Sequence, residues 1–263
     1  MADHKYCYPP EFSVLKNKLD IRDAALLDET ERGIVQSRIL EGSPGGQFDA
    51  AHVKAIHRHL FQDLYDWAGD YRTVEIGKGG RWFHNYQFIE QGMAEVERCI
   101  QAGKLGQGMN ADQFGDYAAG VIANLNYVHP FREGNGRTQM EFLQQLSERA
   151  GHELNTEKIQ RDVWITASHV SHSGTNDLLK AAITYAIDPD RTQTGDKTQA
   201  AVRKYLETVQ AAVSNLRDPL EKQAGLEQLT KIARTYEVMM DRETKERFLP
   251  EQNRDKGCGG RSR

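Results

Sequence analysis

A short segment between two apolar helical patterns sets the architecture of this chain. Its nine residues, 129–137, read His-Pro-Phe-Arg-Glu-Gly-Asn-Gly-Arg. Before it, apolar residues recur at three- and four-residue steps from Phe114 to Val128, the spacing of one helix face. Pro130 cannot continue that helix because it lacks an N–H group. Phe142, Leu143 and Leu146 restart the period. The sequence therefore predicts two helices joined by a tight loop.

The loop has the composition of an anion site. Gly134 and Gly136 allow backbone conformations that are closed to other residues, and they let a ligand approach closely. The unpaired N–H groups at the start of the second helix, together with its dipole, attract negative charge. We expect a phosphate at this position.

The side chains of the loop divide into chemical roles. His129 suits removal of a proton near neutral pH, and Glu133 is a hard oxygen ligand that suits Mg²⁺ beside substrate phosphates. Asn135 can donate to a phosphate oxygen, and Arg137 can hold one with two hydrogen bonds. A lone histidine at a helix end is usually structural. The complete pattern instead favours transfer of a phosphate-containing group to a hydroxyl.

This segment resembles the signature of the Fic family, His-x-Phe-x-Asp/Glu-Gly-Asn-Gly-Arg-x-x-Arg, and the resemblance covers about residues 8–188. It implies an all-α Fic fold, a helical bundle around the central motif hairpin with a small β-flap. It also implies a protein adenylyltransferase that moves AMP from Mg-ATP to a Ser, Thr or Tyr hydroxyl. In that case His129 is the base and Glu133 holds Mg²⁺. The nucleotide would be bound by Phe131, Gly134, Asn135, Gly136 and Arg137.

The chain departs from the family pattern at one position. Where the family has a second arginine, three residues after Arg137, this sequence has Met140. Family members use that arginine on the γ-phosphate, and their inhibitory glutamate pairs with it. Methionine can do neither. Two alternatives therefore stay open, a different nucleotide donor and a weakly active binding protein.

A candidate flap precedes the motif. Residues 72–80 alternate briefly and then break at glycines, which predicts a short β-ribbon ending in a loop, and Trp82 and Phe83 follow. In the family this flap pairs with an extended stretch of the target protein by strand addition. The alternative is a purely structural hairpin. The expected target-binding residues are Ile76, Gly77, Lys78, Gly79 and Gly80.

The first helix is expected at 23–40, with Leu26, Leu27, Ile34 and Ile39 inside and Glu29, Glu31 and Arg32 outside. Residues 37–42 match the short inhibitory pattern of the family, Ser/Thr-x-x-x-Glu-Gly/Asn, with Glu41 as its glutamate. Such short matches are often accidental. The order of the segments is closer to that of family members that bind a separate antitoxin-like inhibitor.

A second amphipathic helix is expected at 48–67, with Asp49 as its N-cap and Gly69 as its end. It carries His52, His57 and His59. Their spacing does not place all three on one face, so we interpret them as solvated residues rather than a zinc site.

Further helices are expected at 89–102, 112–128, 156–168 and 175–187. The predicted organisation is an extended lead-in (1–22), a Fic domain (23–188) and a helical extension (189–263). The extension contains two helices broken at Asp218-Pro219, and its end, 254–263, is expected to be disordered.

Composition excludes several classes. A net charge of −4 with 27% charged residues argues against a strong nucleic-acid binder. No apolar run suits a membrane span or a secretory signal, which predicts a cytoplasmic protein at synthesis. Three widely spaced cysteines indicate neither a disulfide framework nor a zinc knuckle. The family resemblance is compatible with a bacterial toxin or with an effector delivered to another cell by a secretion system.

Overall fold

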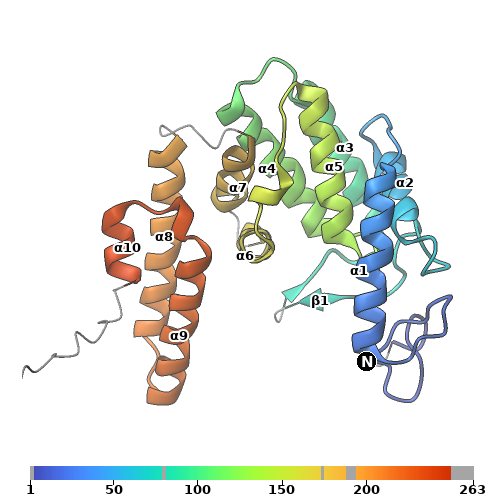
Figure 1. Ribbon diagram of the computed structural model, residues 1–263, viewed down its shortest axis with the longest axis horizontal. Coiled ribbons are helices and arrows are strands. Elements are labelled where there is room, and N and C mark those ends of the chain that lie inside the picture. The colour runs from blue at the N-terminus through green and yellow to red at the C-terminus, as the bar shows by residue number, and fades with distance from the viewer. Residues whose placement is uncertain (1–2, 79–80, 173–174, 188–193, 250–263) are drawn as a thin grey trace, which may run out of the picture.

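The computed structural model describes residues 3–78, 81–172, 175–187 and 194–249. The described part is helical apart from one small ribbon (Figure 1), so the predicted all-α class is confirmed. The α-helices are α1 (Ala24–Glu41), α2 (Ala50–Phe61), α3 (Ile89–Ala102), α4 (Ala111–Val128), α5 (Asn135–Ala150), α6 (Arg161–Ser171), α7 (Asp177–Ile187), α8 (Thr194–Ser214), α9 (Pro219–Thr235) and α10 (Arg242–Phe248). Short 3₁₀ helices span Tyr86–Phe88, Lys104–Gly106, Thr156–Lys158 and Glu237–Met239.

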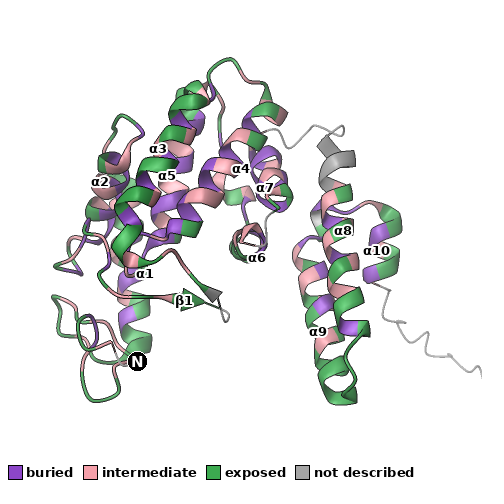
Figure 2. Ribbon diagram, turned by 180° about the vertical axis from the view of Figure 1, so that it is seen from behind, coloured by how far each residue is buried: buried purple, intermediate pink, exposed green. Residues whose placement is uncertain are grey.

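The predicted motif hairpin is the centre of the fold. α4 begins at a reciprocal cap in which the Asn110 side chain accepts from Gln113, whose own side chain accepts from the Asn110 N–H. It ends at His129, and α5 begins after Gly134. The apolar faces of both helices are buried, and Figure 2 shows buried residues where α4, α5 and α7 meet. The hairpin is therefore a rigid support for the loop between its helices.

α1 and α2 flank this hairpin. Asp49 caps α2 as predicted, and Asp23, expected as the first residue of its helix, caps α1; each accepts a hydrogen bond from a first-turn N–H. α2 is shorter than expected, because it ends at Phe61 instead of continuing to Trp67. The chain then turns, and the Gly69 N–H donates to His57 at 2.8 Å. Leu64 fits the apolar spacing of the predicted helix because tertiary contacts bury it in the core, although it lies beyond the end of α2.

The flap is a two-stranded ribbon. β1 (Gly77–Lys78) pairs antiparallel with β2 (Arg81–Trp82), with Gly77 opposite Trp82. The ribbon was predicted from Arg72 onward. Its first strand begins only at Gly77, and Arg72 is a buried residue that precedes it. Gly79 and Gly80, both predicted target-binding residues, lie outside the described residues.

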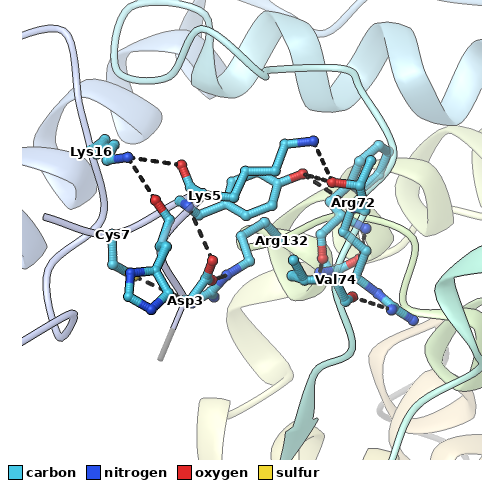
Figure 3. A network of polar contacts seen from close by, with 12 residues as sticks. Asp3, Lys5, Cys7, Lys16, Arg72, Val74 and Arg132 are labelled. Carbon is cyan, nitrogen blue, oxygen red and sulfur yellow. Dashed lines mark hydrogen bonds and ion pairs between the residues drawn. The ribbon is translucent and has the colours of Figure 1, made fainter. Parts of the chain in front are cut away.

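The N-terminal segment folds back on itself rather than running extended. Turns lead to an isolated bridge between Cys7 and Leu15. Asp3 pairs with Arg132 of the motif loop at 2.7 Å, and Lys5 donates to Thr73 at 2.5 Å. Figure 3 shows Asp3, Lys5 and Arg132 within one polar network. The segment therefore packs against the candidate site.

The C-terminal extension contains the predicted helix pair. Asp218 caps α9 and Pro219 is its first residue. α10 was not predicted; Arg203 of α8 joins it by an ion pair with Asp241. The Tyr236 hydroxyl donates to the Val163 carbonyl of α6 at 3.2 Å, which joins the extension to the bundle. The expected disorder at 254–263 falls outside the described residues. Among the described helices, none is long and apolar enough to cross a bilayer.

Candidate active site

His129 ends α4 in a left-handed backbone conformation, φ 46°. Its Nδ1 lies 3.3 Å from the Asn126 carbonyl oxygen. Because a carbonyl only accepts, Nδ1 carries the proton and Nε2 keeps its lone pair. Nε2 has no hydrogen-bond partner among the described residues. The imidazole thus keeps one nitrogen that can accept a proton.

The surroundings of His129 keep it neutral. Burial lowers its pKa to about 3, and the charges of Arg72 and Lys78 lower that pKa further, against the raising effect of the Asn126 carbonyl. The Phe83 ring of the flap stacks on the imidazole, with centroids 3.7 Å apart and planes inclined by 14°. At neutral pH the residue is available to accept a proton, and the flap lies directly over it.

His57 fixes the backbone of the motif loop. Its Nδ1 accepts from Gly69, so Nε2 donates to the Glu133 carbonyl at 3.0 Å. Burial lowers the pKa of His57 to about 4. The interpretation of the α2 histidines as solvated is therefore wrong for His57 and for His52, which are 0% and 2% exposed. Both lie on the buried face of the helix.

Phe131 and Asn135 have structural roles that the sequence reading did not assign. Phe131 is fully buried and stacks on His57, with centroids 3.8 Å apart. The Asn135 amide accepts from the Phe131 N–H at 3.0 Å and donates to the Phe131 carbonyl at 2.8 Å. Asn135 is 3% exposed. These contacts close the loop, and the expected contribution of both residues to nucleotide binding stays a prediction.

The two glycines differ in environment. Gly134 has φ 83°, and a Cβ there would lie 2.3 Å from the Phe61 ring. Gly136 is exposed, and a Cβ on it would meet nothing within 4 Å. Gly134 therefore shapes the turn, whereas Gly136 leaves open space at the first turn of α5. The N–H groups of that turn suit an anion, as expected.

Comparison with known proteins identifies this arrangement. A model described as "Fic/DOC family" matches residues 47–147. A "Probable protein adenylyltransferase y4lH" of Sinorhizobium fredii is 40% identical over 178 residues, which are 67% of this chain and 92% of that protein. The chain belongs to the Fic/DOC family. "Protein adenylyltransferase VbhT" of Bartonella schoenbuchensis is 37% identical over 66% of this chain and 37% of its own length.

Solved Fic structures share the fold. The BepC protein of Bartonella tribocorum, described as a VirB-translocated effector and solved with bound AMPPNP, superposes with a TM-score of 0.66. The match covers 70% of this chain and 97% of that one, at 25% identity. The predicted Fic fold is confirmed.

In this Fic domain the motif arginine has an intramolecular partner. Arg137 forms an ion pair with Glu31 of α1, and the Tyr65 hydroxyl donates to the other Glu31 oxygen. The guanidinium also lies 4.8 Å from the Phe61 ring centroid. Glu31 was expected on the outer face of its helix, but it is 6% exposed. Its spacing of four residues from Leu27 and Val35, both buried, places it on the inner face.

Glu133 fits the expected magnesium role. Its side chain is half-exposed; Oε1 accepts from the Gly134 N–H at 2.9 Å and lies 3.7 Å from Arg137. Oε2 has no protein partner within the described residues. One carboxylate beside substrate phosphates is a common donor set for Mg²⁺. Elsewhere in the described chain, no cluster of three metal-binding side chains is present.

Glu41, the glutamate of the short inhibitory match, lies at the exposed end of α1. It pairs with Arg38 at 2.8 Å. Arg38 in turn contacts Asp63. The charged partners of Arg137 are Glu31 and Glu133, so Glu41 makes no contact with the motif arginine in this structure.

Proposed function

We propose that this Fic protein is a protein adenylyltransferase, which transfers AMP from Mg-ATP to a Ser, Thr or Tyr hydroxyl of a target protein. The observation that carries the proposal is the neutral His129, whose Nδ1 is engaged by the Asn126 carbonyl and whose ring lies under the Phe83 ring of the flap. The names of its relatives describe the same activity.

The reaction follows from this geometry. His129 Nε2 takes the proton of the target hydroxyl as its oxygen forms a bond to the α-phosphorus of ATP. The bond from that phosphorus to the oxygen bridging to the β-phosphate breaks, and pyrophosphate leaves with the electron pair. The product is an AMP ester of the target side chain. The imidazole is neutral before the reaction because burial disfavours its charged form.

The nucleotide would lie at the start of α5. There the first-turn N–H groups and the open space at Gly136 receive phosphate oxygens, and Arg137 supplies positive charge. Mg²⁺, held by Glu133, would neutralise developing charge on the phosphates when bound. His57 and Asn135 hold the loop in shape, so the cradle is preorganised.

The target would bind along the flap. Gly77 and Lys78 are exposed, and the N–H of Phe83, whose ring covers His129, donates to the Ile76 carbonyl just before them at 3.1 Å. An extended target segment paired with residues 76–78, and continuing along Gly79 and Gly80, would present its hydroxyl to the imidazole by strand addition. The aromatic cover would exclude water from the transferred group.

Met140 supports a second candidate, the use of another nucleotide donor. It is partly buried on α5 and gives the distal phosphate no charge. A weakly active binding protein remains the alternative from a different class. The proposal also includes synthesis in the cytoplasm. There the protein would act either as a toxin held by a separate antitoxin-like inhibitor or as an effector delivered to another cell, and the description of BepC suggests the second role.

Labelled nucleotides test the function. The purified protein, Mg²⁺ and a lysate are incubated with ATP labelled at either the α- or the γ-phosphate. Protein-bound label from α-labelled ATP alone, with a mass increase equal to AMP, is expected. Label from the γ-phosphate would indicate phosphoryl transfer instead. Bound ATP with no transfer from either label would favour another donor or the binding protein.

A further inference from the structure

Arg72 lies between the flap and the motif loop with its side chain fully buried, 0% exposed. The nearest carboxylate, that of Glu75, is 3.8 Å from Nη1 and is partly exposed. A buried guanidinium is costly unless its N–H groups find acceptors. Backbone carbonyl oxygens supply them here.

Three consecutive carbonyls, at the end of α4 and the start of the motif loop, accept from Arg72. Nε donates to His129 at 2.8 Å, Nη2 to Val128 at 3.2 Å, and the main-chain N–H to Pro130 at 2.8 Å. His129 has a positive φ, a conformation that residues other than glycine rarely adopt. Arg72 therefore stabilises the backbone on both sides of the residue that carries the base.

The same guanidinium reaches both ends of the flap. Nη1 donates to Val74 at 2.8 Å (Figure 3), and Nη2 also donates to the His84 carbonyl. The His84 N–H donates to Tyr127 at 3.1 Å. Both arms of the ribbon are thus joined to the last turn of α4 through one side chain.

The flap residue next to His84 is Phe83, whose ring stacks on the His129 imidazole. Arg72 therefore fixes the backbone of His129 on one side and the segment that carries the covering ring on the other. A lysine could not replace it, because a single ammonium cannot span carbonyls on both segments.

We propose that Arg72 is a positioning residue that locks the flap and His129 in one register, so that a hydroxyl held on the flap meets Nε2. This inference rests on the proposed function. Arg72 acts on the acceptor side of the reaction, since His57, Asn135 and Phe61 shape the nucleotide side without it.

The test compares wild type with Arg72→Lys, and uses Arg98→Lys as the control. Arg98 is exposed on α3 and pairs only locally, with Glu95. Three readouts are taken: binding of Mg-AMPPNP, the upfield NMR shift that the Phe83 ring gives the His129 ring protons, and label transfer from α-labelled ATP. In Arg72→Lys we expect unchanged nucleotide binding, loss of the upfield shift and transfer lower by about a hundredfold, the scale for a misplaced catalytic group.

Two results would overturn the proposal. One is an Arg72→Lys variant that transfers label at the wild-type rate, and the other is an Arg72→Lys variant that no longer binds nucleotide. The wild type supplies a measurement that does not depend on the variant folding. The Nε–H of Arg72 and the amide of His84 should be protected from solvent exchange and should open together. Opening of the flap amide while Arg72 stays protected would contradict the lock. If the wild type binds nucleotide but transfers no label, the proposed function fails. The NMR shift and the exchange protection still test whether Arg72 holds the flap against His129.

Discussion

Glu31 of the first helix forms an ion pair with Arg137 of the Fic motif, and the Tyr65 hydroxyl holds the second Glu31 oxygen. Glu133 adds a carboxylate 3.7 Å from the same guanidinium. With Met140 in place of a second arginine, two carboxylates surround Arg137, the motif cation at the proposed phosphate site. Arg137 therefore meets an incoming phosphate with much of its charge already compensated.

Glu31→Gln should strengthen Mg-ATP binding. The amide keeps a hydrogen-bonding shape but removes the charge that competes with phosphate. At partly buried distances this is worth about 1 kcal/mol, roughly fivefold in Kd. Calorimetric titration measures it, and Glu41→Gln, on the exposed end of the same helix, should leave Kd unchanged. Weaker binding by Glu31→Gln would mean that Glu31 chiefly holds Arg137 in place.

Met140→Arg should increase the use of ATP. Met140 lies three residues after Arg137, so an arginine there adds a cation on the same side of α5. We expect a larger gain in affinity for ATP than for ADP, because the added charge serves the distal phosphate. The two dissociation constants and the transfer rate measure this. An unchanged or lower rate with ATP would count against ATP as the donor.

Gly134→Ala and Gly136→Ala form a matched pair. Alanine at 134 must adopt φ 83° and contact Phe61, so we expect an unfolding free energy lower by at least 1–2 kcal/mol, the scale for a forced left-handed residue. Alanine at 136 meets open space, so stability should hold while the methyl group crowds a phosphate. Thermal unfolding and Mg-ATP titration distinguish the two effects. Equal loss of stability in both variants would contradict the different roles.

Stability should fall as the pH drops below about 6.5, the ordinary histidine value. Burial lowers the pKa of His57 to about 4 and that of His129 to about 3, so between these values and 6.5 the unfolded chain binds protons that the folded chain does not. Denaturant unfolding from pH 7 to 4.5 measures the slope. His57→Gln should flatten it by up to about 1.4 kcal/mol per pH unit; an unchanged slope would contradict a buried neutral His57.

The helices and the motif loop could be predicted because they depend on local rules. Apolar spacing located α3 and α4, and Asp23, Asp49 and Asp218 marked helix starts. The motif also singled out His129, Glu133 and Gly136, whose expected roles stay predictions.

Residues that act through distant contacts were missed. Glu31 and His57 lie on buried stripes of their helices, but their polarity led to assignment on the outside, although the four-residue spacing was visible. Arg72 has no periodic signal at all, because its five hydrogen bonds go to carbonyls brought together by the fold. The bonds of Asn135 with the Phe131 backbone were also missed, because they depend on the loop conformation.

The most direct test of the central claim is transfer by His129 variants. His129→Asn tolerates the left-handed backbone, and His129→Ala removes the ring. Both are compared with wild type for Mg-ATP binding and for AMP added to protein, measured by intact mass. Because the base acts on the acceptor hydroxyl, we expect both variants to bind ATP nearly as wild type does and to transfer no AMP. Transfer that persists without the imidazole, or ATP binding that disappears with it, would contradict the role of His129 as the base.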